Sequence, residues 1–253
     1  MNTPNFLWPS LSHPPALDSD QIHVCAWNID RAPTTADWKI LDEEETVRAR
    51  RFVFPRDRDR YVRSHATVRR LLGSYAEISP AKISFETSEY GKPSLRETAN
   101  GSTLEFNLTH SGGVAVLAVA RRYPLGVDIE LIRAIDLEIA EHHFSTRELE
   151  TLRSLPEASW LAGFFRCWTS KEALLKGEGM GLNLALDSFD VEADPLRPPD
   201  LLASRSVSRL SLDWKLFGLQ PTPEIAGALA VRNAGRLEES TVQCAVQCFV
   251  LTE

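Results

Sequence analysis

Apolar and polar residues alternate with a period of two in several short segments, which is the pattern of half-buried β-strands. The clearest segment is 125–131, in which Asp128 and Glu130 emerge on one face with Cα atoms about 6–7 Å apart. Two carboxylates therefore share a strand face. Further strands are predicted at 22–27, 83–86, 104–108, 114–120, 187–191, 211–217, 225–231 and 242–251.

A spacing of three and four residues between apolar positions predicts helices. In 160–176 the apolar stripe carries Glu172, an acid that needs a partner in such a position. The other predicted helices begin at Asp42 and end before Pro55, or span 57–75, 136–143 and 146–155.

This order of elements predicts an α+β fold. We expect a proline-rich extended arm over residues 1–20, one half over 21–123 and a second half over 124–253. A weak similarity between residues 27–30 and residues 127–130 indicates two similar halves. We expect strands 83–86 and 104–108 to be antiparallel, residues 109–113 to form a turn, and the proline-rich segment 194–205 to be a surface loop.

Charge is unevenly distributed along the chain. The formal net charge of −7 argues against a nucleic-acid binder, yet nine arginines stand between positions 48 and 70. A small anionic ligand is the favoured target, and an arginine-rich solvated helix face stays open as the alternative. The four cysteines lack metal-ligand spacing, and no apolar run reaches the roughly 20 residues of a membrane span. Because prolines interrupt the first stretch, we expect no signal peptide. We expect a cytoplasmic protein that contacts no membrane.

Three acids and two lysines form the candidate site. Asp128, Glu130 and Glu172 are oxygen ligands of the kind that Mg²⁺ prefers, and Lys171 and Lys176 can neutralise phosphate charge. This set predicts a magnesium–diphosphate site. The alternative is an acidic strand end facing solvent and a surface ion pair between Glu172 and Lys176.

Other motifs are weaker. His110 beside Ser111 lacks the flanking glycines of a nucleophile elbow, and Glu86 stands where a phosphate-binding loop before Lys92 would need glycine.

Five blocks in this order resemble the Sfp-like 4′-phosphopantetheinyl transferases, and they cover most of the chain. They are Arg50-Arg51-Phe52 with Arg60, Glu89-Tyr90-Gly91-Lys92-Pro93, 106–112, 126–130, and 168–176 running into 177–182.

The resemblance implies a pseudo-dimer of two similar α+β subdomains, each a mainly antiparallel sheet packed with helices, with the ligand between them. It implies transfer of phosphopantetheine from coenzyme A to a serine of an acyl, aryl or peptidyl carrier protein, with release of adenosine 3′,5′-bisphosphate. Asp128, Glu130 and Glu172 would hold Mg²⁺, and Glu172 would be the base.

The resemblance also implies a coenzyme A site on the first half. The residues expected to hold coenzyme A, chiefly its 3′-phosphoadenosine end, are Arg60, Lys92, Thr109 and His110, with Arg48 and Arg51 as further candidates. Lys171 and Lys176 would neutralise charge on the diphosphate. Glu45 stands where close relatives have a phosphate-binding lysine.

Two other functions stay open at this point: a regulator that binds coenzyme A without turnover, and a metal-dependent nucleotide hydrolase with water as the acceptor. The expected state is a monomer.

Overall fold

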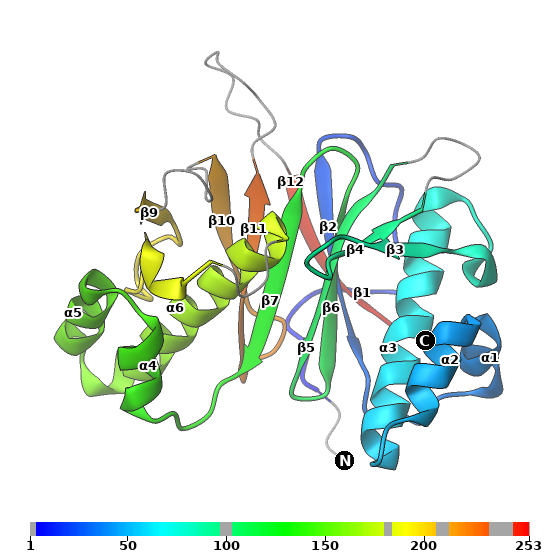
Figure 1. Cartoon of the computed structure of the whole chain (residues 1–253), viewed down its shortest axis with the longest axis horizontal. Coiled ribbons are helices and arrows are strands. Elements are labelled where there is room, and N and C mark those ends of the chain that lie inside the picture. The colour runs from blue at the N-terminus through cyan, green and yellow to red at the C-terminus, as the bar shows by residue number, and fades with distance from the viewer. Residues whose placement is uncertain (1–3, 97–102, 180–183, 206–212, 233–244, 253) are drawn as a thin grey trace.

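The structure is a computed structural model that describes residues 4–96, 103–179, 184–205, 213–232 and 245–252. Two sheets stand side by side at its centre, and helices flank them on both sides (Figure 1). The first sheet has the strand order β1-β12-β2-β6-β5, and the second has the order β10-β11-β7. The mixed α and β content agrees with the predicted fold class.

The first sheet is built from segments far apart in the sequence. Its strands are β1 (Ser10–Leu11), β2 (Gln21–Asn28), β5 (Glu105–Ser111), β6 (Val114–Ala120) and β12 (Ala245–Leu251). Strands β2, β6 and β5 are antiparallel neighbours, whereas β12 lies parallel to both β1 and β2. The C-terminal strand, expected in the second half, therefore belongs to the sheet of the first.

The second sheet is antiparallel throughout. Its strands are β7 (Leu125–Leu131), β10 (Trp214–Leu219) and β11 (Ile225–Arg232). A separate hairpin pairs β8 (Phe189–Val191) with β9 (Leu201–Ser204). The segment 194–205, predicted to be a loop, therefore contains a strand.

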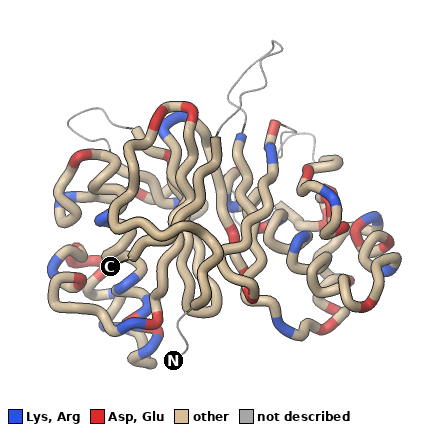
Figure 2. The backbone as a smooth tube through the Cα atoms, turned by 180° about the vertical axis from the view of Figure 1, so that it is seen from behind, with Lys and Arg blue, Asp and Glu red and all other residues tan. Residues whose placement is uncertain are grey.

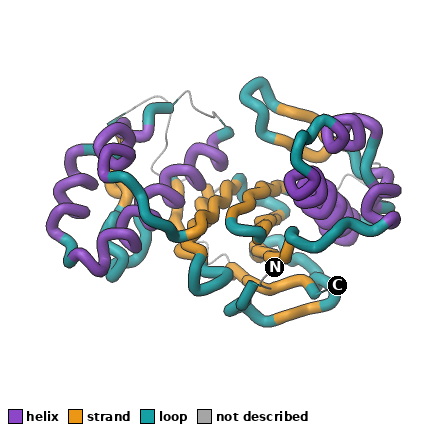
Figure 3. Tube along the Cα trace, turned by 90° about the horizontal axis from the view of Figure 1, so that it is seen from below, coloured by secondary structure: helices purple, strands orange, loops and turns teal. Residues whose placement is uncertain are grey.

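Each sheet is covered by one long helix of 22 residues, α3 (Pro55–Ala76) or α6 (Glu157–Glu178). Shorter helices lie outside them, namely α1 (Thr35–Ile40), α2 (Glu43–Arg50), α4 (Leu137–His143) and α5 (Thr146–Ser154). Seen from below, the helices occupy the two flanks and the strands lie between them (Figure 3). The short helix α1 was not predicted. Its start is fixed by a capping box between Thr34 and Asp37.

Two local predictions were wrong. Strand β3 (Phe85–Thr87) pairs with β4 (Pro93–Leu95), not with the strand at 104–108. Residues 109–111, expected in a turn, end strand β5, and the turn itself is made at Gly112 and Gly113, which both have positive φ. Only glycine adopts such backbone conformations at little cost.

Charged residues gather on the helices and loops, and the central strands carry few of them (Figure 2). Asp128 and Glu130 on β7 are exceptions, because their strand lies where the two sheets meet. None of the described helices combines the length and apolar character that a membrane span requires.

Candidate functional site

Strand β5 of the first sheet lies against strand β7 of the second, and polar side chains join them. Asn107 Oδ1 accepts a hydrogen bond from Val127 N at 2.9 Å. Thr109 Oγ1 donates to Asp128 Oδ1 at 3.1 Å, and Ser111 Oγ donates to Glu130 Oε2 at 2.9 Å. Because alternate residues of a strand share a face, the polar side chains of β5 reach the two acids of β7 in turn.

Asp128 is the most buried of the candidate acids, with 4% of its surface exposed. Lys176 Nζ of helix α6 donates to its Oδ1 at 2.6 Å, while its Oδ2 has no hydrogen-bond partner in the described structure. Burial raises the pKa of Asp128 to about 6, although the ammonium of Lys176 opposes this. A buried carboxylate oxygen without a partner is costly in a protein interior.

Glu172 lies on the turn of α6 that precedes Lys176. Burial raises the pKa of its carboxyl, Lys176 opposes that rise, and Glu130 adds to it. Glu130 and Glu172 both raise the pKa of Asp128, and Glu130 raises that of Glu172, so the three acids interact electrostatically. Their role as a common ligand site stays a prediction.

Two glycines allow α6 to lie directly on β7. A Cβ atom at Gly126 would stand 2.1 Å from Ala173 O and 2.2 Å from Gly177 N. No side chain fits in that space, so strand and helix touch through their backbones. This close approach brings the last turns of α6 beside Asp128.

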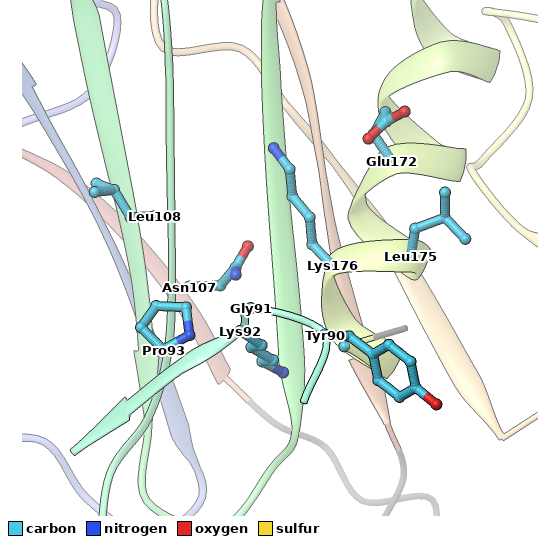
Figure 4. A pocket seen from close by; sticks show the side chains of 10 residues that line it. Tyr90, Gly91, Lys92, Pro93, Asn107, Leu108, Glu172, Leu175 and Lys176 are labelled. Carbon is cyan, nitrogen blue, oxygen red and sulfur yellow. The ribbon is translucent and has the colours of Figure 1, made fainter. Parts of the chain in front are cut away.

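A cavity of about 300 Å³, which we call the central cavity, opens between the two halves (Figure 4). Its lining comes from the 90–93 turn, strand β5 and helix α6: Tyr90, Gly91, Lys92, Pro93, Asn107, Leu108, Glu172, Leu175, Lys176 and Gly179. Lys92 Nζ donates to Leu125 O at 3.1 Å and to Gly177 O at 2.8 Å, so its ammonium joins the two halves at the edge of this cavity.

A second cavity of about 300 Å³, which we call the arginine cavity, lies between the α2–α3 region and β5. It is lined by Ile29, Arg48, Phe52, Asp57, Arg60, Tyr61, Ser64, His65, Leu108 and His110. Leu108 lines both cavities, which therefore adjoin. Arg60 Nε donates to Asp30 Oδ1 at 2.6 Å. Burial, together with the charges of Lys176 and Arg60, lowers the pKa of His110.

The prediction that Lys171 faces the diphosphate beside the three acids was wrong. Its side chain is fully buried, forms an ion pair with Glu148 Oε1 at 2.8 Å, and donates to the carbonyl oxygens of Leu186 and Phe189. Residues 171 and 172 are adjacent, and adjacent helical side chains point about 100° apart. Lys171 therefore faces α5 and β8, away from the three acids. Arg51 is exposed and lines neither cavity.

The acid set can be tested for a fit to magnesium. Among the described residues, no three metal-ligating side chains stand close enough together to make a preformed metal site. The buried Asp128 Oδ2 without a partner and the two neighbouring carboxylates are nevertheless the hard oxygen donors that Mg²⁺ prefers. The donor set fits the ion in its chemistry.

Sequence reasoning missed Asn107 and Ser111, whose hydrogen bonds connect the two sheets. It also missed Glu148, which forms an ion pair with Lys171. The signal for the first two was available, because polar residues stand at the alternate positions 107, 109 and 111 of the strand. Their partner strand could not be read from the sequence.

The fold and the site define an α+β protein with two adjoining cavities, one between its two halves and one within the first half. Residues 25–122 match a family model described as 4′-phosphopantetheinyl transferase, N-terminal, and residues 124–230 match the 4′-phosphopantetheinyl transferase superfamily.

Individual relatives agree. The chain is 34% identical over 231 residues to the 4′-phosphopantetheinyl transferase HetI of Nostoc sp., covering 89% of this chain and 94% of the relative. It is 37% identical over 175 residues to psf-1 of Bacillus pumilus, covering 67% and 73%. It is 34% identical over 152 residues to Sfp of Bacillus subtilis, covering 60% and 66%. The chain belongs to the 4′-phosphopantetheinyl transferase superfamily.

Proposed function

We propose that this enzyme transfers the 4′-phosphopantetheine group of coenzyme A to a serine hydroxyl of an apo carrier protein, in a Mg²⁺-dependent reaction. The serine oxygen forms a bond to the phosphorus that bears pantetheine. The bond from that phosphorus to the bridging oxygen breaks, and adenosine 3′,5′-bisphosphate leaves with the electron pair.

The observation that carries this proposal is a path of cationic side chains through two adjoining cavities. Lys92 and Lys176 line the central cavity together with Glu172, and Lys176 Nζ donates to Asp128 Oδ1, whereas Arg48, Arg60 and His110 line the arginine cavity. A ligand with a phosphorylated nucleoside end and a diphosphate matches such a path, because arginine forks bind phosphate oxygens bidentately. We assign the 3′-phosphoadenosine end to the arginine cavity and the diphosphate to the central cavity.

Asp128, Glu130 and Glu172 would hold Mg²⁺, which would offset charge on the diphosphate oxygens when bound. Lys176, already on Asp128 at 2.6 Å, supplies a fixed positive charge next to the leaving group. Thr109 Oγ1 holds the other side of Asp128 Oδ1 at 3.1 Å. Lys92 borders the same cavity and can contact the diphosphate from the first half.

Glu172 is the proposed general base for the serine hydroxyl, directly or through a water. A base works best when its pKa lies near the working pH, and burial moves the pKa of Glu172 upward from its ordinary value. Its side chain lines the central cavity, where the reacting phosphorus would stand (Figure 4). The carrier would dock at the cleft between the halves, with its serine directed into this cavity.

The direct test combines the protein, coenzyme A, magnesium and an apo carrier protein, and measures the carrier by intact-mass spectrometry. We expect the carrier to gain one phosphopantetheine group, and we expect no gain when its acceptor serine is alanine or when a chelator removes magnesium. An unmodified carrier with folded protein would contradict the proposal.

Two other outcomes identify the alternatives. Release of adenosine 3′,5′-bisphosphate without a mass gain on the carrier would indicate a hydrolase. Tight binding of coenzyme A without turnover would indicate a regulator.

A further inference from the structure

Glu45 on helix α2 contacts a residue that lines the arginine cavity but does not line the cavity itself. It is buried and stands at the third position of helix α2, where its Oε2 caps Asp42 N at 3.2 Å. The same oxygen accepts from Arg69 Nε at 2.6 Å, and Arg69 is fully buried. These contacts lower the pKa of Glu45 against the effect of burial, so the carboxylate is ionised and its charge is offset by Arg69.

The second oxygen of Glu45 holds a histidine. Its Oε1 lies 2.9 Å from His65 Nδ1, and His65 lines the arginine cavity beside Arg60 and His110. A carboxylate on one ring nitrogen fixes the orientation of the imidazole. Because Nδ1 is occupied by Glu45, Nε2 is the nitrogen left for a ligand.

Aromatic packing fixes the plane of the same ring. Tyr61 stacks on His65 with ring centroids 4.0 Å apart, and the guanidinium of Arg48 lies over Tyr61 at 5.6 Å. Burial raises the pKa of Tyr61 to about 12, so its hydroxyl stays neutral and does not compete with an anion. The imidazole is thus held from two directions and keeps 28% of its side chain exposed.

We infer that His65 is a specificity residue that binds the 3′-phosphate of coenzyme A, with Glu45 as the positioning residue that orients it. This inference rests on the proposed function. The remaining charges around the cavity are consistent with an anion, since Asp57 is the one acid among the lining residues and Asp30 is taken up by Arg60 and Arg56.

The test is isothermal titration of coenzyme A and of 3′-dephospho-coenzyme A into wild type, His65→Ala and His65→Gln. Wild type should prefer coenzyme A. The preference should fall about tenfold or more in both variants, because a charge-assisted hydrogen bond to phosphate is lost. His65→Gln retains a hydrogen-bonding partner for Glu45 without the charge, so it gives the answer if His65→Ala does not fold. His142→Gln on α4, whose ring contacts Glu138 O outside both cavities, should behave as wild type.

The positioning role of Glu45 has its own readout. Glu45→Gln should weaken the preference for coenzyme A in wild type and leave it unchanged in the His65→Ala background, since it acts through the histidine. Equal effects in both backgrounds would show that Glu45 does not act through His65.

The possible failures are distinguishable. If wild type binds neither ligand, the proposed function is wrong. If wild type discriminates and His65→Gln discriminates equally well, His65 is a structural histidine and the inference is overturned.

Discussion

Helix α6 carries two lysines in different environments, one buried and one partly exposed. Lys171 is fully buried against Glu148 and two carbonyl oxygens, whereas Lys176 is one-third exposed and contacts Asp128 at the central cavity. The two residues are five positions apart on the helix, which places them about 140° apart around its axis. The comparison shows that one lysine holds the helix in place and the other faces the central cavity, although both belong to the same short run of sequence.

The largest expected effect is on stability at Lys171. Lys171→Met should lower the free energy of unfolding by about 3–5 kcal/mol, because Glu148 would remain as a buried uncompensated charge. Chemical denaturation measures this. Adding Glu148→Gln should recover part of the loss. Transfer per folded molecule should change little, and loss of transfer by a stably folded variant would place Lys171 in the site.

The corresponding substitution at the second lysine is Lys176→Met. Transfer should fall about 100-fold or more, because a preorganised positive charge beside the leaving group is lost. Stability should fall less than in Lys171→Met, because Lys176 is partly exposed and Asp128 can take up a proton. Steady-state transfer and chemical denaturation, measured on the same samples, check the expected effects on activity and on stability. If Lys176→Met were mainly destabilising, the contrast between the two lysines would fail.

Asp128, the partner of Lys176, should make the stability of the protein depend on pH. Its folded pKa of about 6 lies above the ordinary value of 3.8, so the folded state binds the proton more tightly than the unfolded state. The stability that this provides is present below about pH 4 and is lost as the pH rises through about 6. Asp128→Asn should therefore be more stable than wild type by about 3 kcal/mol at pH 7, with the difference shrinking toward pH 4.

Denaturation at several pH values measures this difference, and transfer by Asp128→Asn should be lost. A variant that is less stable than wild type at pH 7 would show that Asp128 supports the fold and is not a strained functional acid.

The smallest effect is expected at Thr109. Thr109→Val removes the hydrogen bond to Asp128 at 3.1 Å, which should cost about 0.5–1.5 kcal/mol of stability. Thr109→Ser keeps the hydroxyl and serves as the matched control. Equal behaviour of the two variants would show that the hydroxyl does not support Asp128.

Local patterns predicted much of the site. Alternation in β7 placed Asp128 and Glu130 together, and the helical spacing of α6 placed Glu172 near Lys176. The direction of Lys171 could not be predicted, because α6 is buried on most of its circumference and its apolar residues do not mark one face. The contacts of β5 with β7 and the position of β12 beside β2 depend on partners distant in sequence, which periodicity does not report.

The measurement that tests the account most directly is single-turnover transfer by Glu172→Gln at saturating coenzyme A and magnesium. Glutamine keeps the volume of the side chain but cannot take a proton from serine. We expect coenzyme A to bind and the transfer rate to fall about 10²–10⁴-fold, as is usual for the loss of a positioned base. A loss under about tenfold would contradict the assignment of Glu172 and leave the base unassigned.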